Sequence, residues 1–95
     1  MTKKYELTII LDGKASSAKK KSVIESIEKT VKLLTGKVVK TEDWGVKQMF
    51  HKIGKSQEGL YVHFELELPV KAVRQLSQKL QMDEQILRNL LVVSK

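Results

Sequence analysis

The chain has 95 residues, no cysteine and a formal net charge of +7, which predicts one domain over residues 1–95 and excludes disulfides and thiolate metal sites. No apolar run approaches the roughly 20 residues of a membrane-spanning helix, and the N-terminus lacks a signal-peptide cleavage site, so we expect a cytoplasmic protein. The positive charge favours a polyanionic partner, RNA or DNA before a membrane, although a solvated basic surface without any partner is the alternative.

A strand and a helix are predicted first. Alternate residues are apolar from Lys4 to Leu11, which is typical of a strand with one buried face. Asp12-Gly13 forms a turn, and Ser16 or Ser17 can cap a helix that runs to about Thr35. Gly36 is expected to end this helix in the left-handed conformation. The buried stripe of the helix, with Ile24 beside it, consists of Val23, Ile27, Val31 and Leu34.

A long β-hairpin is predicted next. Its first arm covers Lys37 to about Ile53, and its second arm alternates strictly and ends at Pro69. A polar turn is expected between Gly54 and Gly59. Gly45 interrupts the first arm, and a glycine inside a strand pattern indicates a bulge.

A second helix and a last strand complete the chain. Pro69 suits the first turn of a helix, because that turn leaves its N–H groups unpaired. The expected apolar stripe of this helix is Val70, Val73, Leu76 and Leu80. Residues 81–84 are the predicted connector, and the last strand covers Ile86 to Val93.

The order β-α-β-β-α-β predicts an α+β, ferredoxin-like fold, in which a four-stranded antiparallel sheet carries both helices on one face. The residues expected to face the helices are Tyr5, Leu7, Ile9, Val62, Phe64 and Leu66. Those expected on the uncovered face are Lys4, Glu6, Thr8, Tyr61, His63, Glu65, Arg88, Leu90 and Val92. This phase places Asn89 and Leu91 on the helix side, and the opposite phase of the last strand is left open.

Catalytic and metal-binding patterns are weak in this sequence. It contains no cysteine nucleophile, no serine-histidine-acid signature and no Gly-rich phosphate loop, so we expect neither an enzyme nor a cofactor. Glu42 and Asp43 are neighbours on a strand and should point to opposite faces. The hairpin can bring His51 and His63 together, but two histidines without a third ligand make a poor metal site.

Basic and apolar residues are better candidates for function. Lysine and arginine side chains can contact phosphate groups, and the candidates for RNA binding are Lys3, Lys4, Lys47, Lys52, Lys55 and Arg88. An ion pair between Arg88 and Glu6 or Glu65 is an equally strong structural interpretation. Apolar residues on an uncovered sheet indicate a covering partner, and the candidates for protein contact are Tyr61, His63, Leu90 and Val92.

Several short motifs, taken in order, resemble those of the bacterial small-subunit ribosomal protein S6 family. They are Tyr5-Glu6, the EDWG of residues 42–45 with the basic KQMF after it, Ile53-Gly54-Lys55, the GLY of residues 59–61, the ELP that ends at Pro69, and the closing ILRNLLV with Arg88. The resemblance covers nearly the whole chain. Many family members have Tyr-Pro where this chain has His51-Lys52, so the contacts of that segment are expected to differ.

The resemblance implies the fold deduced above and a non-enzymatic protein. It further implies binding to the central domain of small-subunit (16S) ribosomal RNA, as a heterodimer with ribosomal protein S18. Two alternatives remain: a free-standing RNA-binding module that stacks bases on Tyr61, and a ferredoxin-like oligomerisation or small-ligand regulatory domain.

Overall fold

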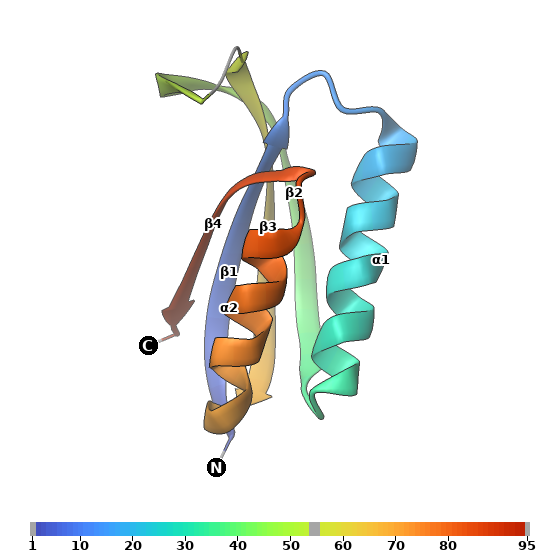
Figure 1. Cartoon of the computed structure of the whole chain (residues 1–95), viewed down its shortest axis with the longest axis vertical. Coiled ribbons are helices and arrows are strands. Elements are labelled where there is room, and N and C mark those ends of the chain that lie inside the picture. Colours follow the sequence, from blue (N-terminus) through green and yellow to red (C-terminus); the bar gives the residue numbers. More distant parts are fainter. Residues whose placement is uncertain (1, 54–55, 95) are drawn as a thin grey trace.

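The computed structural model describes residues 2–53 and 56–94. In chain order the elements are β1 (Thr2–Asp12), α1 (Ser17–Leu33), β2 (Lys37–Ile53), β3 (Ser56–Pro69), a short 3-10 helix η1 (Val70–Ala72), α2 (Val73–Met82) and β4 (Ile86–Val93). The strands form one antiparallel sheet in the order β2-β3-β1-β4. Both helices cover the same face of this sheet (Figure 1). The predicted ferredoxin-like fold is therefore confirmed.

The core lies between the sheet and the helices. The central strands β1 and β3 supply its largest side chains, and Leu7, Ile9, Val62 and Phe64 are each 0% exposed. All six residues predicted to face the helices are buried. The stripe predicted for α1 is confirmed at Val23, Ile27 and Val31, whereas Ile24 and Leu34 pack at its margin.

The second helix begins differently from the prediction. Val70 falls in the 3-10 turn η1 and is 45% exposed, so its assignment to the buried stripe was wrong. Ala72 is buried in this part of the fold, and Leu76 and Leu80 are buried as expected. The helix also continues through Met82, which shortens the predicted connector.

The end of α1 is closed by Thr35, not by Gly36. Thr35 has a φ of 63°, and its N–H donates to the Lys32 carbonyl over 3.0 Å. The Gly36 N–H donates to the Val31 carbonyl over 2.8 Å, which completes a Schellman motif. A glycine is needed at 36 for another reason: a Cβ atom there would lie 2.5 Å from the Glu67 carbonyl oxygen. The predicted left-handed conformation of Gly36 was therefore wrong, because Thr35 adopts it instead. Gly36 is required by its close packing against Glu67.

The second arm of the hairpin begins earlier than predicted. Ile53 pairs with Ser56, and Gly59 lies inside β3, so the polar turn predicted from Gly54 to Gly59 was wrong. The register also sets His63 opposite Glu42, far back along β2 from His51, so the hairpin does not bring these two positions together. The predicted bulge at Gly45 is confirmed by a shift of register after Asp43 and by a φ of 79°.

Candidate functional site

The face of the sheet opposite to the helices is here called the open face. Directly paired residues of neighbouring antiparallel strands point to the same side, so the register assigns each side chain to a face. Arg88, Leu90 and Val92 pair with Ile10, Thr8 and Glu6, which confirms the predicted phase of β4. Asn89 and Leu91 accordingly pair with Ile9 and Leu7 on the helix side, and both are half-buried.

Three of the six candidate RNA-binding residues share the open face. Lys4, Lys47 and Arg88 are exposed there. Lys3 pairs with the buried Leu68 and therefore belongs to the other side of the sheet. The side chain of Lys52 and all of Lys55 lie outside the described residues.

Lys47 and Arg88 lie toward the same end of the open face. The register runs from Gly45 through Tyr61 and Ile10 to Arg88 across the four strands, and Lys47 follows Gly45 by two residues on β2. Lys4 pairs with Glu67 toward the opposite end. The ion pairs formed within the described part of the chain do not include Arg88, so the pairing with Glu6 or Glu65 considered from the sequence is not formed.

The four residues considered for protein contact differ in exposure. Leu90 and Val92 on the edge strand β4 are 62% and 43% exposed, and Tyr61 is half-buried. His63 lies on the open face as predicted, but it is only 8% exposed. The indole of Trp44 covers it, with ring centroids 4.6 Å apart and ring planes 9° from parallel. His63 is thus a support for Trp44 and offers little free surface of its own.

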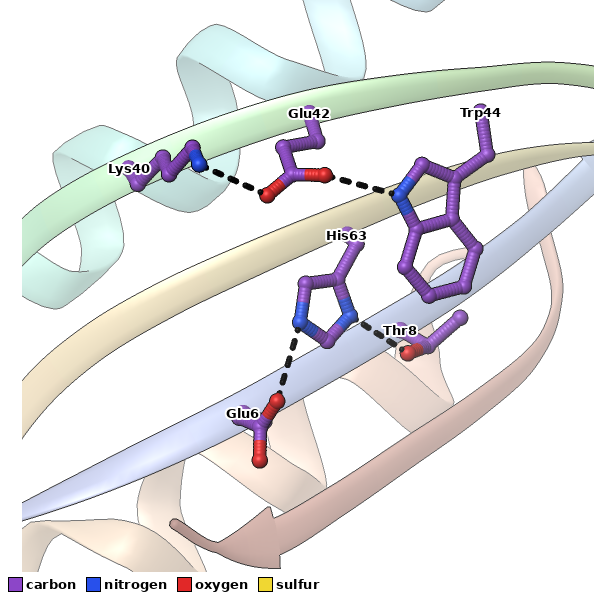
Figure 2. A network of polar contacts seen from close by, with 6 residues as sticks. All are labelled: Glu6, Thr8, Lys40, Glu42, Trp44 and His63. Atoms are coloured by element: carbon purple, nitrogen blue, oxygen red, sulfur yellow. Dashed lines mark hydrogen bonds and ion pairs between the residues drawn. The ribbon is translucent and has the colours of Figure 1, made fainter.

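Both ring nitrogens of His63 have partners on β1 (Figure 2). The Nδ1 atom lies 2.9 Å from the Thr8 hydroxyl, and Nε2 lies 3.3 Å from a Glu6 carboxylate oxygen. One neutral tautomer satisfies both contacts, with Nε2–H donating to Glu6 and Nδ1 accepting from Thr8. These contacts fix the plane of the imidazole on which Trp44 stacks.

Trp44 is held at its edge as well as at its inner face. Its Nε1–H donates to Glu42 over 3.1 Å, and Glu42 also pairs with Lys40 over 3.1 Å (Figure 2). The hydrogen bond from Trp44, followed by that from Lys40, lowers the pKa of Glu42, and the hydrogen bond to Glu42 raises the pKa of Lys40. Glu42 therefore stays ionised as the anchor of the indole. Trp44 as a whole remains 40% exposed.

Lys47 is the last member of the group of side chains around Trp44. Its ammonium lies 5.2 Å from the centroid of the Trp44 ring and 5.8 Å from that of Tyr61, both within cation–π range. The sequence reasoning did not select Trp44 as a functional residue. The signal that could have found it is its position just before Gly45, because the bulge sets Trp44 and Gly45 together against Tyr61.

Other kinds of site find little support in residues 2–53 and 56–94. The side chains that the structure describes include no group of three or more histidine, aspartate or glutamate residues placed to hold a metal ion. None of the helices described is long and apolar enough to cross a membrane. What the open face offers is charge, aromatic rings and apolar surface.

Comparisons with known proteins agree with this architecture. The family model for ribosomal protein S6 matches residues 4–93. Small ribosomal subunit protein bS6 of Pelagibacter ubique is 34% identical over 96% of this chain and 75% of its own length. The bS6 protein of Clostridioides difficile is 24% identical over 95% of this chain and 97% of its own length.

A solved structure has the same fold at low identity. The 30S ribosomal protein S6 of Thermotoga maritima superposes with a TM-score of 0.91 at 19% identity, covering 99% of this chain and 89% of that one. The family model and the relatives that align along most of the chain together show that it belongs to the ribosomal protein S6 family of the small ribosomal subunit, and so to the cytoplasmic ribosome.

Proposed function

We propose that this chain is a structural, non-enzymatic protein that binds the central domain of 16S ribosomal RNA as a heterodimer with ribosomal protein S18. Membership of the S6 family supports the ribosomal role. The proposed RNA and S18 partners rest on a division of the open face into two parts. One is a cationic, aromatic end, and the other is an apolar edge on β4. The cationic end comprises Lys47, Arg88, Trp44 and Tyr61, and the apolar edge comprises Leu90 and Val92.

The cationic end suits RNA. Lys47 and Arg88 are exposed and form no ion pair with a described carboxylate, so both are available to phosphate oxygens. Arg88 can grip two phosphate oxygens at once, because its guanidinium presents a planar fork of donors. Lys55, which lies outside the described residues, is expected from the sequence to add to the same electrostatic attraction.

The apolar edge suits a protein. Leu90 and Val92 project from β4 onto the open face, next to Thr8 and Glu6 on β1. Covering them removes apolar area from water, and this contributes to association by about 25 cal/mol per Å² of apolar surface. RNA offers no comparable apolar surface, so this edge is assigned to the protein partner.

A second protein partner explains how a small surface with few phosphate contacts can bind RNA tightly. A few phosphate contacts give weak and strongly salt-dependent binding to RNA alone. A protein bound to both the RNA and the apolar edge raises the effective concentration of each site for the other. We therefore expect tight RNA binding only when both proteins are present.

The test is binding to a central-domain ribosomal RNA fragment, with and without S18, at a low and a high salt concentration. Tight and salt-dependent binding in the presence of S18 alone is the expected result. Absence of binding in both cases would contradict the proposal.

Two arginine variants sharpen the test, because the chain contains one arginine on each side of the sheet. Arg88→Ala should weaken the complex with RNA and S18 by about tenfold, since a hydrogen bond to a charged group contributes about 1.5–3 kcal/mol. Arg74→Ala, which removes an exposed arginine from α2, is the matched control and should leave affinity unchanged. Equal affinities in the two variants would remove Arg88 from the site. Lys55→Ala is expected to act in the same direction as Arg88→Ala.

One observation favours a second candidate, a free-standing RNA-binding module. Trp44 adds an exposed ring near the half-buried Tyr61, and two aromatic rings with a nearby cation are typical of sheets that bind single-stranded RNA. Equally tight binding with and without S18 would favour this candidate.

A further inference from the structure

Trp44 is a large aromatic ring fixed in one orientation on an uncovered sheet. In Figure 2 the indole and the His63 imidazole lie side by side in nearly parallel planes, in front of the strands, with the helices behind. His63 supports the inner face of the indole, and Glu42 holds its Nε1–H. A ring held at one face and one edge is already oriented for a ligand on its outer face, and little conformational entropy is lost when that ligand binds. The Lys47 ammonium lies over the ring, 5.2 Å from its centroid, so it has to move aside for such a ligand.

The backbone around Trp44 leaves space beside its outer face. Gly45, the neighbour of Trp44 on the bulge, pairs with Tyr61 and carries no side chain. A Cβ atom added to Gly45 would meet nothing within 4 Å. The rings of Trp44 and Tyr61 therefore border an open part of the sheet, and the Lys47 ammonium lies within 6 Å of both, at 5.2 and 5.8 Å.

The positive charge of Lys47 beside the two rings favours an anionic ligand. A free lysine ammonium next to two aromatic rings repels a guanidinium or a second ammonium, which argues against a basic side chain of a protein partner. A nucleotide combines a flat ring, which can stack on the indole, with a phosphate that attracts the ammonium. Lys47 can turn from the rings to such a phosphate, because it is exposed and has no carboxylate partner among the described residues.

We propose that the outer face of Trp44 is a stacking platform for one unpaired nucleobase of the bound RNA, with Lys47 contacting a phosphate next to that base. Stacking on an aromatic ring tolerates every base, so the platform is expected to recognise single-stranded character instead of sequence. The inference rests on the proposed RNA binding and adds to it the residue that receives a base.

Two variants of Trp44 separate stacking from structural support. Trp44→Phe and Trp44→Leu both lose the hydrogen bond to Glu42, but only the phenylalanine keeps an aromatic face. In the complex with S18 and the central-domain RNA fragment, Trp44→Leu should bind about tenfold more weakly than Trp44→Phe, because stacking of a base contributes about 1–3 kcal/mol. Thermal unfolding of the two free variants checks that they are equally folded.

The intrinsic fluorescence of the wild-type chain provides a second measurement. Trp44 is the single tryptophan of the chain, so intrinsic fluorescence recorded as the difference from a Trp44→Phe sample reports on this ring alone. Quenching is expected when RNA joins the two proteins, and no change is expected when S18 is added without RNA.

The possible results are distinguishable. Failure of the wild-type chain to bind RNA with S18 would overturn the proposed function and the platform together. Normal RNA binding with equal affinities of the two variants and no quenching would overturn the platform only. A fluorescence change on addition of S18 alone would also overturn it, because Trp44 would then belong to the protein interface.

Discussion

The two faces of the sheet bury side chains for different reasons, and the neighbours His63 and Phe64 on β3 show the difference. Phe64 points to the helices and is 0% exposed inside a wholly apolar core. His63 points to the open face and is 8% exposed, although no helix covers that face. One indole and two polar contacts bury the histidine, whereas two helices bury the phenylalanine.

This difference separates stability from recognition along a single strand. Apolar packing between sheet and helices is the main source of folding free energy in such a domain. The open face instead satisfies its polar groups locally and leaves rings and cations exposed. Substitutions on the helix side should therefore change stability most, and those on the open face should change binding most.

The largest expected effect is that of Phe64→Ala. Removal of a fully buried phenylalanine should lower the free energy of unfolding by about 3–5 kcal/mol, because it leaves a cavity and loses apolar burial. Denaturant unfolding followed by circular dichroism measures this change. His63→Ala on the other face is the matched comparison and should cost about 1–3 kcal/mol, the sum expected for one ring contact and the hydrogen bond with Thr8. The contact with the partly exposed Glu6 adds little. Equal losses would break the contrast between the two faces.

Two glycine substitutions sharpen the same comparison. Gly36→Ala should destabilise the fold by about 2 kcal/mol, because the new methyl group would lie 2.5 Å from a backbone oxygen of Glu67 and 2.6 Å from Leu68 Cδ2. Gly45→Ala on the open face meets empty space and should cost only about 1 kcal/mol, from its left-handed φ of 79°. Thermal unfolding of both variants is the measurement. A larger loss for Gly45→Ala would show that the bulge, not the tight packing at Gly36, limits stability.

The smallest expected effect concerns Asp43, which points to the helix side and pairs with Lys20 of α1. The hydrogen bond from Lys20, followed by that from the Gly45 N–H, lowers the pKa of Asp43. A lowered pKa in the folded state means that the stabilisation is complete at neutral pH. It is lost as the pH falls from the usual aspartate value of about 3.9 through the lowered one.

Asp43→Asn tests this pH dependence, because asparagine can still accept from the Gly45 N–H. The variant should be slightly less stable than the wild type at neutral pH, and the difference should vanish in acid. The effect is small because both side chains of the ion pair are partly exposed. Glu28→Gln, which changes an exposed carboxylate of α1, is the control. A difference that persists in acid would mean that the charge of Asp43 does not stabilise the fold.

Much of the fold could be predicted from the sequence, since the order of elements, the buried faces of β1 and β3, the stripe of α1 and the span of β4 follow from periodicity. The errors share one cause. The turn between the hairpin arms, the ends of both helices and the role of Gly36 depend on which backbone atoms meet after folding, and a local pattern does not contain that information. The left-handed Thr35 is an example, because a β-branched residue is among the least expected in that conformation.

For the candidate site, the sequence by itself determined that the chain is basic, that β4 carries Arg88, Leu90 and Val92 on one side, and that its motifs belong to the ribosomal protein S6 family. The tertiary structure alone decided that Trp44 lies over His63 and that Arg88 forms no ion pair with Glu6 or Glu65. The physical reason is register. Alternation along a strand fixes only the face of each side chain, whereas its neighbours depend on how the strands slide past one another and on the bulge at Gly45.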